Sequence, residues 1–169
     1  MAGIEPHRRW QGVLRADVMA SLSVIHSSHM KVMLSQLEKA QASLRRSIAV
    51  FDRVSGGQDI DLIETTRSGV VQNFKVAYEQ SWKVLRRWMM QYLGISDSEI
   101  AQRRQLYRLA AKNSLINDVE AWWDFHVARN LTSHTYNEAM ALEVVEVAHK
   151  FDVACVRLIE NLAASSQDG

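Results

Sequence analysis

The segment at residues 129–136, Arg-Asn-Leu-Thr-Ser-His-Thr-Tyr, brings several chemically useful side chains into one short run. An arginine can hold a phosphate through two parallel hydrogen bonds, and a histidine can transfer a proton near neutral pH. Arg129 is therefore the candidate phosphate ligand, and it would stabilise the charge that develops on the non-bridging oxygens. His134 is the candidate general acid or base. Together they are the two groups that metal-free cleavage of a phosphodiester needs, but the two residue types co-occur by chance in many helical proteins.

Each residue of this pair also has a purely structural interpretation. Arg129 alone could be a cation that the dipole favours at a helix C-terminus, and His134 alone could be a hydrogen-bonding loop residue. Asn130 could position the phosphate or cap a broken helix. Because the spacing of Arg129 and His134 puts them roughly 140° apart on an ideal helix, either the helix breaks between them or the site draws groups from two subunits.

Other polar side chains have two readings as well. Tyr136 could be a core aromatic residue, or its hydroxyl could help hold substrate. Lys83, Arg86 and Arg87 could follow an RNA backbone, or they could form an ordinary solvated helix face. No Gly-rich phosphate loop, Cys/His cluster or Gly-Ser-x10-Asp-x-Asp nucleotidyltransferase signature accompanies them, so the sequence predicts no metal site and no nucleotidyltransferase activity of its own.

Tryptophans at helical spacing favour a hydrophobic core over base stacking at Trp82, Trp122 and Trp123. The single cysteine, Cys155, lies in an apolar helical run and is predicted to be a small buried hydrophobe. One cysteine cannot form an internal disulfide, which fits a reducing cytoplasm. His126 and His149 stand alone in the sequence and receive no role.

The length of the chain predicts one folded domain. Its net charge gives no overall attraction to nucleic acid. The chain has 169 residues and a formal net charge of +1, so any RNA binding must come from a local patch. No apolar run reaches the roughly 18 residues of a membrane span. The sequence therefore predicts a cytoplasmic protein with no membrane association.

Apolar residues at three- and four-residue steps predict an all-α, up-and-down bundle of about four principal helices plus a shorter one. The first helix should begin at Lys31 and end at the left-handed glycines of Ser55-Gly56-Gly57. Asp61 should cap the second, which ends near Gly94, and Ser96 to Glu99 should open the third. The remaining two helices are expected at residues 118–129, capped by Asp118, and at 138–162, capped by Thr135 or Asn137.

The domain organisation follows from these elements. Residues 30–164 should form the helical domain, and residues 165–169 a frayed tail. Residues 1–29 are expected to be an extension outside this domain, either disordered or non-native, with Met30 as an alternative start.

Three stretches carry a resemblance to a known family. They are residues 71–85 (VQNFKVAYEQSWKVL), Ala121-Trp122, and residues 128–137 (ARNLTSHTYN). They resemble the HEPN superfamily, in the branch of HepT-like toxins or nucleotidyltransferase substrate-binding proteins, over roughly residues 31–162. The middle helix departs from the family pattern, since Lys75 stands where an acidic residue is usual.

The resemblance implies a helical bundle that forms a homodimer, with the Arg-x4-His motifs of two subunits brought together as a metal-independent RNase. It also implies a toxin whose antitoxin is a minimal nucleotidyltransferase that adenylylates the motif tyrosine, here Tyr136. The breadth of the apolar face on the final helix predicts that the last two helices form the dimer contact. The alternative is a non-catalytic adaptor subunit that binds a nucleotidyltransferase.

Overall fold

The computed structural model describes residues 7–132 and 138–165, with side chains from residue 28 onward, and most of these residues are helical. In order the helices are α1 (His7–Val54), α2 (Ile60–Tyr92), α3 (Arg103–Lys112), α4 (Val119–Leu131) and α5 (Glu138–Ser165). These ranges contain no strand. The predicted all-α bundle, with four principal helices and a shorter α3, is confirmed.

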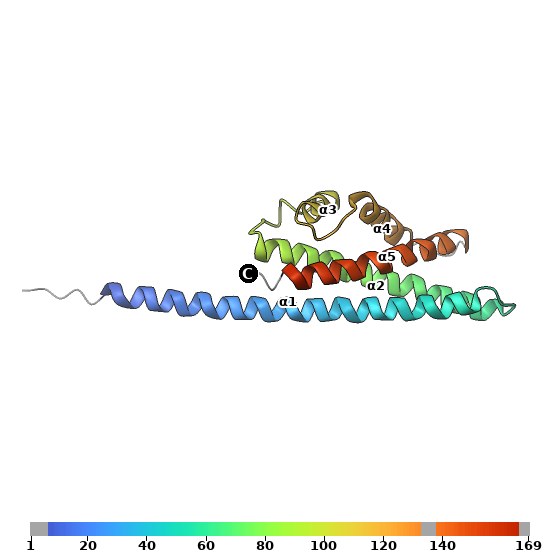
Figure 1. Ribbon diagram of the computed structural model, residues 1–169, viewed down its shortest axis with the longest axis horizontal. Coiled ribbons are helices and arrows are strands. Elements are labelled where there is room, and N and C mark those ends of the chain that lie inside the picture. The colour runs from blue at the N-terminus through green and yellow to red at the C-terminus, as the bar shows by residue number, and fades with distance from the viewer. Residues whose placement is uncertain (1–6, 133–137, 166–169) are drawn as a thin grey trace, which may run out of the picture.

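The long helices α1, α2 and α5 lie side by side, with α3 and α4 on one side of them (Figure 1). α2 runs antiparallel to α1, and α5 returns along both of them. α4 contacts α2, α3 and α5. Its last turn therefore lies over the middle of α2, and this contact positions the candidate site.

Capping residues explain where α2 and α4 begin. Asp118 caps α4 as predicted, because its carboxylate accepts hydrogen bonds from the amides of Glu120 and Ala121 at 2.9 and 3.0 Å. The predicted cap of α2 was wrong by two positions. Asp59, not Asp61, accepts from the Leu62 amide at 3.0 Å, which satisfies one of the free N–H groups of the first turn.

Two other predicted boundaries also differ. The Ser96 amide does donate to Glu99 at 2.9 Å, but only an isolated turn follows, and α3 begins at Arg103. Gly94 adopts the left-handed backbone that ends α2, with φ of 62°, whereas Gly56 and Gly57 do not adopt it. A glycine after a helix therefore did not by itself indicate a left-handed cap.

The first helix extends far beyond its predicted start. α1 begins at His7 and continues without a break through residue 31 to Val54. Its N-terminal part projects past the ends of the other helices (Figure 1). Among the described residues, no helix combines the length and apolar character needed to cross a membrane.

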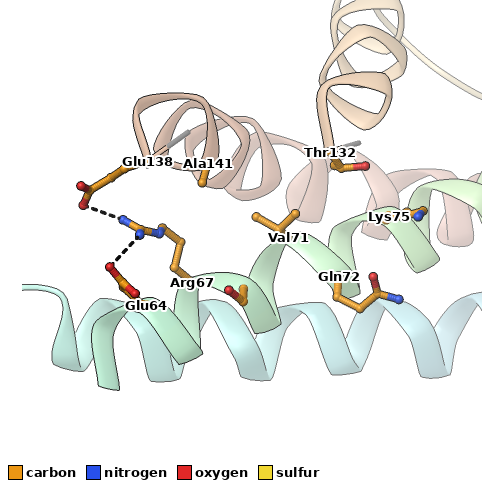
Figure 2. A pocket seen from close by; sticks show the side chains of 9 residues that line it. Glu64, Arg67, Val71, Gln72, Lys75, Thr132, Glu138 and Ala141 are labelled. Carbon is orange, nitrogen blue, oxygen red and sulfur yellow. Dashed lines mark hydrogen bonds and ion pairs between the residues drawn. The ribbon is translucent and has the colours of Figure 1, made fainter. Parts of the chain in front are cut away.

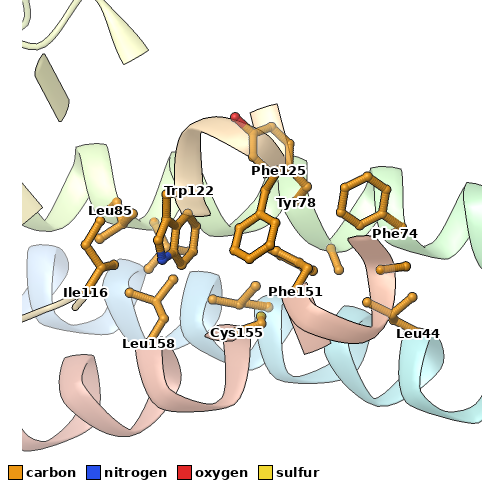
Figure 3. Packing of buried hydrophobic residues seen from close by; sticks show 14 of the residues in the cluster. Leu44, Phe74, Tyr78, Leu85, Ile116, Trp122, Phe125, Phe151, Cys155 and Leu158 are labelled. Carbon is orange, nitrogen blue, oxygen red and sulfur yellow. The ribbon is translucent and has the colours of Figure 1, made fainter. Parts of the chain in front are cut away.

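Aromatic rings from three helices meet in the centre of the bundle (Figure 3). Phe151 of α5 makes edge-on contacts with Phe74, Phe125 and Trp122, at centroid distances of 5.3, 5.3 and 5.9 Å. Such edge-on pairs are the favoured geometry for aromatic rings. Cys155 is fully buried beside them, as predicted, and burial raises the pKa of its thiol. This core fixes α4 against α2 and α5.

Candidate functional site

Arg129 lies in the last turn of α4 and points toward α2. Its Nε atom is 2.6 Å from Oε1 of Glu79, with exposed side-chain fractions of 28% and 26%. The Nε atom is buried and has no partner of hydrogen-bond geometry among the described residues, so this contact is a close ion pair rather than an aligned hydrogen bond. Because solvent reaches only a quarter of each side chain, the pair is screened less than a surface salt bridge.

The second oxygen of Glu79 is also engaged. The indole Nε1 of Trp82 donates a hydrogen bond to Glu79 Oε2 at 3.0 Å. Glu79 and Trp82 lie three positions apart on α2, where side chains of one helix face can meet. One carboxylate therefore connects the indole on α2 to the guanidinium on α4.

A chain of hydrogen bonds approaches Arg129 from the other side. Oδ1 of Asn130 lies 3.5 Å from Nη1 of Arg129, and its amide Nδ2 lies 3.3 Å from Nε2 of His126. Nδ1 of His126 is 2.9 Å from the hydroxyl of Tyr78, which bonds in turn to the hydroxyl of Tyr107. The chain connects the buried tyrosines of α2 and α3 to the exposed end of α4.

The hydrogen-bond donors around His126 define which of its ring nitrogens carries the proton. A guanidinium only donates, so Asn130 turns Oδ1 toward Arg129 and its donating Nδ2 toward His126. Nε2 of His126 therefore accepts, and its ring proton lies on Nδ1. That proton is donated to the oxygen of Tyr78, whose own proton is then donated to Tyr107. Burial, followed by the nearby cations Arg103 and Arg129, lowers the pKa of His126 below its ordinary 6.5. The neutral imidazole that the chain requires is therefore favoured.

Two arginines of α3 cover tryptophan rings beside the site. The guanidinium carbon of Arg103 is 3.3 Å from the ring centroid of Trp82, and that of Arg104 is 5.0 Å from the centroid of Trp123. Of the three tryptophans predicted to be core, only Trp122 is buried, and the other two are half-buried. They line a cationic surface because α3 crosses their outer faces.

The three predicted RNA-contacting cations lie farther along α2. Lys83, Arg86 and Arg87 help to line a groove of about 410 Å³ between α1 and α2, which Trp82 also borders. Arg86 is ion-paired with Asp97. Within the described ranges, neither Lys83 nor Arg87 lies within ion-pair distance of a carboxylate, so these two are better placed to bind a phosphate.

A polar pocket of about 320 Å³ adjoins the motif on the opposite side, between α2, α5 and the end of α4 (Figure 2). The nearly buried Arg67 contacts Glu138 at 2.9 Å and Glu64 at 3.9 Å. Thr132 and Lys75 also line the pocket. Because Glu138 is the first residue of α5, Arg67 fixes the start of that helix to α2.

The described residues contain only part of the predicted site. Arg129 and Asn130 are adjacent and in contact, whereas His134 and Tyr136 lie outside the described residues, as do both predicted caps of α5. The hydroxyl of Thr132 donates to the carbonyl of Arg129 at 2.6 Å. This bond satisfies one of the carbonyls that the last turn of α4 leaves without a backbone partner.

Sequence reasoning missed the residues that surround Arg129, which are Tyr78, Glu79, Arg103, Tyr107 and His126. The sequence spacing of polar and aromatic residues on two helices could have indicated them. Polar side chains occur on α4 at positions 126, 129 and 130, and on α2 at 78, 79 and 82, which is one face of each helix. Within the ranges that the structure describes, no three His, Cys, Asp or Glu side chains gather where they could hold a metal ion.

Comparison with known proteins identifies relatives over most of the chain. The family model described as nucleotidyltransferase substrate binding protein like matches residues 32–164. A protein of Haemophilus influenzae named probable ribonuclease HepT is 28% identical over 140 residues, covering 81% of this chain and 96% of the relative. The match therefore spans the bundle and includes the motif.

Two solved structures share the fold. One, from Haemophilus influenzae, is described as revealing the fold of a substrate binding domain of a nucleotidyltransferase. It is 28% identical, covers 77% of this chain and 98% of its own, and has a TM-score of 0.69. The other, from Thermus thermophilus, is 23% identical, covers 75% and 98%, and has a TM-score of 0.62. The second supports the fold alone.

Proposed function

Because this chain belongs to the family of nucleotidyltransferase substrate binding protein like proteins, we propose that it is a metal-independent RNase of a toxin–antitoxin pair in the cytoplasm. The observation that carries the proposal is the place of Arg129. Its guanidinium is held at the end of α4, at the start of the motif, and remains partly open to solvent. The similarity to a probable ribonuclease supports the same reading.

In the proposed reaction Arg129 binds the scissile phosphate through its terminal nitrogens, since Glu79 contacts Nε. His134 takes the proton from the attacking RNA 2′-hydroxyl or water, or gives a proton to the departing 5′-oxygen. The guanidinium stabilises the negative charge on the non-bridging oxygens. Asn130 lies beside Arg129 and would help to position the phosphate.

The complete site is proposed to form in a homodimer. One subunit supplies one guanidinium and one imidazole, and their spacing on an ideal helix turns them apart by roughly 140°. Bringing together the motifs of two subunits would supply both an acid and a base to one phosphate. The groove that Lys83 and Arg87 line, next to Trp82, would carry the flanking RNA backbone.

The first prediction tests the catalytic pair. Purified wild-type chain should cleave RNA in the presence of EDTA. His134→Ala should lower kcat by ~10²–10⁴-fold, the usual contribution of a general acid or base, and Arg129→Ala by ~10²–10³-fold, the usual contribution of one group that stabilises developing charge. His149→Ala is the matched control, because His149 is a partly exposed histidine of α5 that pairs with Asp52. Equal cleavage by all three variants would end the catalytic reading and indicate a contaminating nuclease.

A second prediction concerns the partner, which we propose is a minimal nucleotidyltransferase that adenylylates Tyr136 and so neutralises the toxin. An adenylyl group adds bulk and a negative phosphate, which would oppose the phosphates of RNA. Tyr136→Phe keeps the ring and removes the acceptor oxygen. This variant should remain toxic to growing cells when the partner is co-expressed, whereas the wild type should be silenced. Full neutralisation of Tyr136→Phe would indicate inhibition by binding alone.

The alternative function is a non-catalytic adaptor that presents substrate to a nucleotidyltransferase. The description of one solved relative as a substrate binding domain favours it. The toxicity of the His134→Ala variant distinguishes the two functions. A folded His134→Ala protein that is as toxic as the wild type would support the adaptor, and loss of toxicity would support the RNase.

A further inference from the structure

We propose that Glu79 and the Tyr78–His126–Asn130 chain are positioning residues that hold the guanidinium of Arg129 from two sides, in the orientation that phosphate binding requires. This inference rests on the proposed RNase function for its kinetic consequence. It does not rest on that function for its structural content. It assigns roles to residues outside the Arg-x4-His motif, on both α2 and α4.

Glu79 forms the stronger side of the arrangement. Its Oε1 lies 2.6 Å from Nε of Arg129, and its Oε2 accepts the indole proton of Trp82 at 3.0 Å. The carboxylate therefore cannot rotate away from Arg129 without losing a second bond. Since both members of the ion pair are about three-quarters buried, the pair should hold its geometry better than an exposed one, which solvent and salt screen.

The ring of Trp82 is itself held in place. The guanidinium of Arg103 stacks on it at 3.3 Å from the centroid, a distance at which cation and ring attract each other. The order of support therefore runs from Arg103 on α3, through Trp82 and Glu79 on α2, to Arg129 on α4. Three helices fix the direction of one cationic side chain.

His126 sets the orientation of the second side. In the Nδ1–H tautomer, Nε2 of His126 accepts from the amide of Asn130, and this bond holds Oδ1 of Asn130 toward Arg129. The reversed amide would turn two N–H donors toward the guanidinium. Asn130 is exposed and its contact with Arg129 is long, at 3.5 Å, so this side should contribute less than Glu79.

The kinetic consequence follows from orientation. A guanidinium that is already aimed before RNA arrives loses little further freedom on binding phosphate, and a displacement of about 1 Å can cost on the order of 10²-fold in rate. Removing a positioning residue should therefore lower kcat more than it raises KM. Arg129 would still be present to bind RNA, but it would be aimed less well in the transition state.

The experiment combines NMR with kinetics on the full chain. The side-chain Nε–H signal of Arg129 is identified by its disappearance in Arg129→Lys, and its ¹H–¹⁵N heteronuclear NOE reports how ordered the group is. We expect a high NOE in the wild type and a clear decrease in Glu79→Gln, with smaller decreases in His126→Gln and Tyr78→Phe. Ring ¹⁵N shifts should show His126 as the neutral Nδ1–H tautomer.

Matched controls separate positioning from general loss of charge or stability. Glu120→Gln removes the exposed partner of Arg104, and His149→Gln removes a histidine of α5. Neither should change the Arg129 signal. In RNA cleavage, Glu79→Gln should lower kcat by about 10- to 100-fold with a melting temperature close to that of Glu120→Gln.

Unchanged NOE and unchanged kcat in Glu79→Gln would overturn the role of Glu79. An Nε2–H tautomer of His126 would overturn the arrangement on the Asn130 side. A wild-type chain that cleaves no RNA would instead contradict the proposed function, and the NMR measurements would still decide whether the positioning network exists.

Discussion

At the scale of single residues, the surroundings of His126 determine its charge. Burial and the cations Arg103 and Arg129 lower its pKa, while Glu79 acts in the opposite direction. The folded protein therefore binds fewer protons at this site than the unfolded chain does, once the pH falls toward the ordinary pKa of 6.5. Stability from this site is complete above that pH and is lost as the pH falls through it toward the lower folded value.

The third prediction uses that difference. Free energies of unfolding measured at about pH 7.5 and about pH 5 should fall more for the wild type than for His126→Gln, because glutamine does not titrate. The difference should stay within ~1 kcal/mol, since solvent partly screens the half-exposed imidazole. An identical decrease in both proteins would show that His126 does not titrate differently on folding. His149→Gln provides the control.

The ion pair of Arg129 shows why this site could not be predicted fully. The chemical type of Arg129 and its distance in sequence from His134 are local facts, and both could be identified in the sequence. The contact with Glu79 joins positions that are far apart in the chain. It exists only because the last turn of α4 lies over the part of α2 that contains Glu79. No periodicity within one helix predicts that crossing.

At the scale of elements, most helices could be predicted from their apolar spacing, and Asp118 from its place before α4. The errors concerned starts and ends, where several residues offer similar chemistry. Asp59 and Asp61 both precede the same helix, and only the backbone geometry selects Asp59 as the cap. The start of α1 at His7 was missed because residues 1–29 were expected to be an extension outside the helical domain.

Two glycines, one within α2 and one just after its end, give the fourth prediction. Gly94 has φ of 62°, and a Cβ added there meets no atom within 4 Å. Gly94→Ala should therefore destabilise the protein by about 1–2 kcal/mol through backbone strain alone. Gly69 also has open space but lies within the helix, so Gly69→Ala should stabilise by about 0.5–1 kcal/mol. Urea unfolding of both variants checks the opposite signs, and equal signs would contradict the backbone assignment.

At the scale of the whole molecule, the homodimer stays a prediction, and the exposed apolar side chains on the last two helices are the candidates for its contact. Val127 of α4 and Leu142 of α5 each have a relative solvent exposure of 43%. A single exposed apolar side chain is normal on a protein surface. The dimer prediction therefore requires that one contact cover both Val127 and Leu142. A dimer would cover them and bring two copies of Arg129 into one assembly.

The fifth prediction tests that contact directly. Static light scattering at micromolar concentration should give the mass of a dimer for the wild type, and Leu142→Glu or Val127→Glu should shift it toward the monomer by placing a charge in an apolar contact. Val32→Glu is the matched control, because Val32 is also exposed but lies on α1. A wild-type mass of one chain would contradict the dimer, and so would a Val32→Glu variant that dissociates as readily.

The projecting start of α1 also affects how the molecule moves through solvent. A helix of 48 residues is about 72 Å long at 1.5 Å per residue, well beyond the rest of the bundle (Figure 1). Such a rod raises the frictional ratio, so the protein should elute from a sizing column as though it were heavier than the mass that light scattering gives. Tumbling should be anisotropic as well, with slower reorientation of the α1 axis than rotation about it.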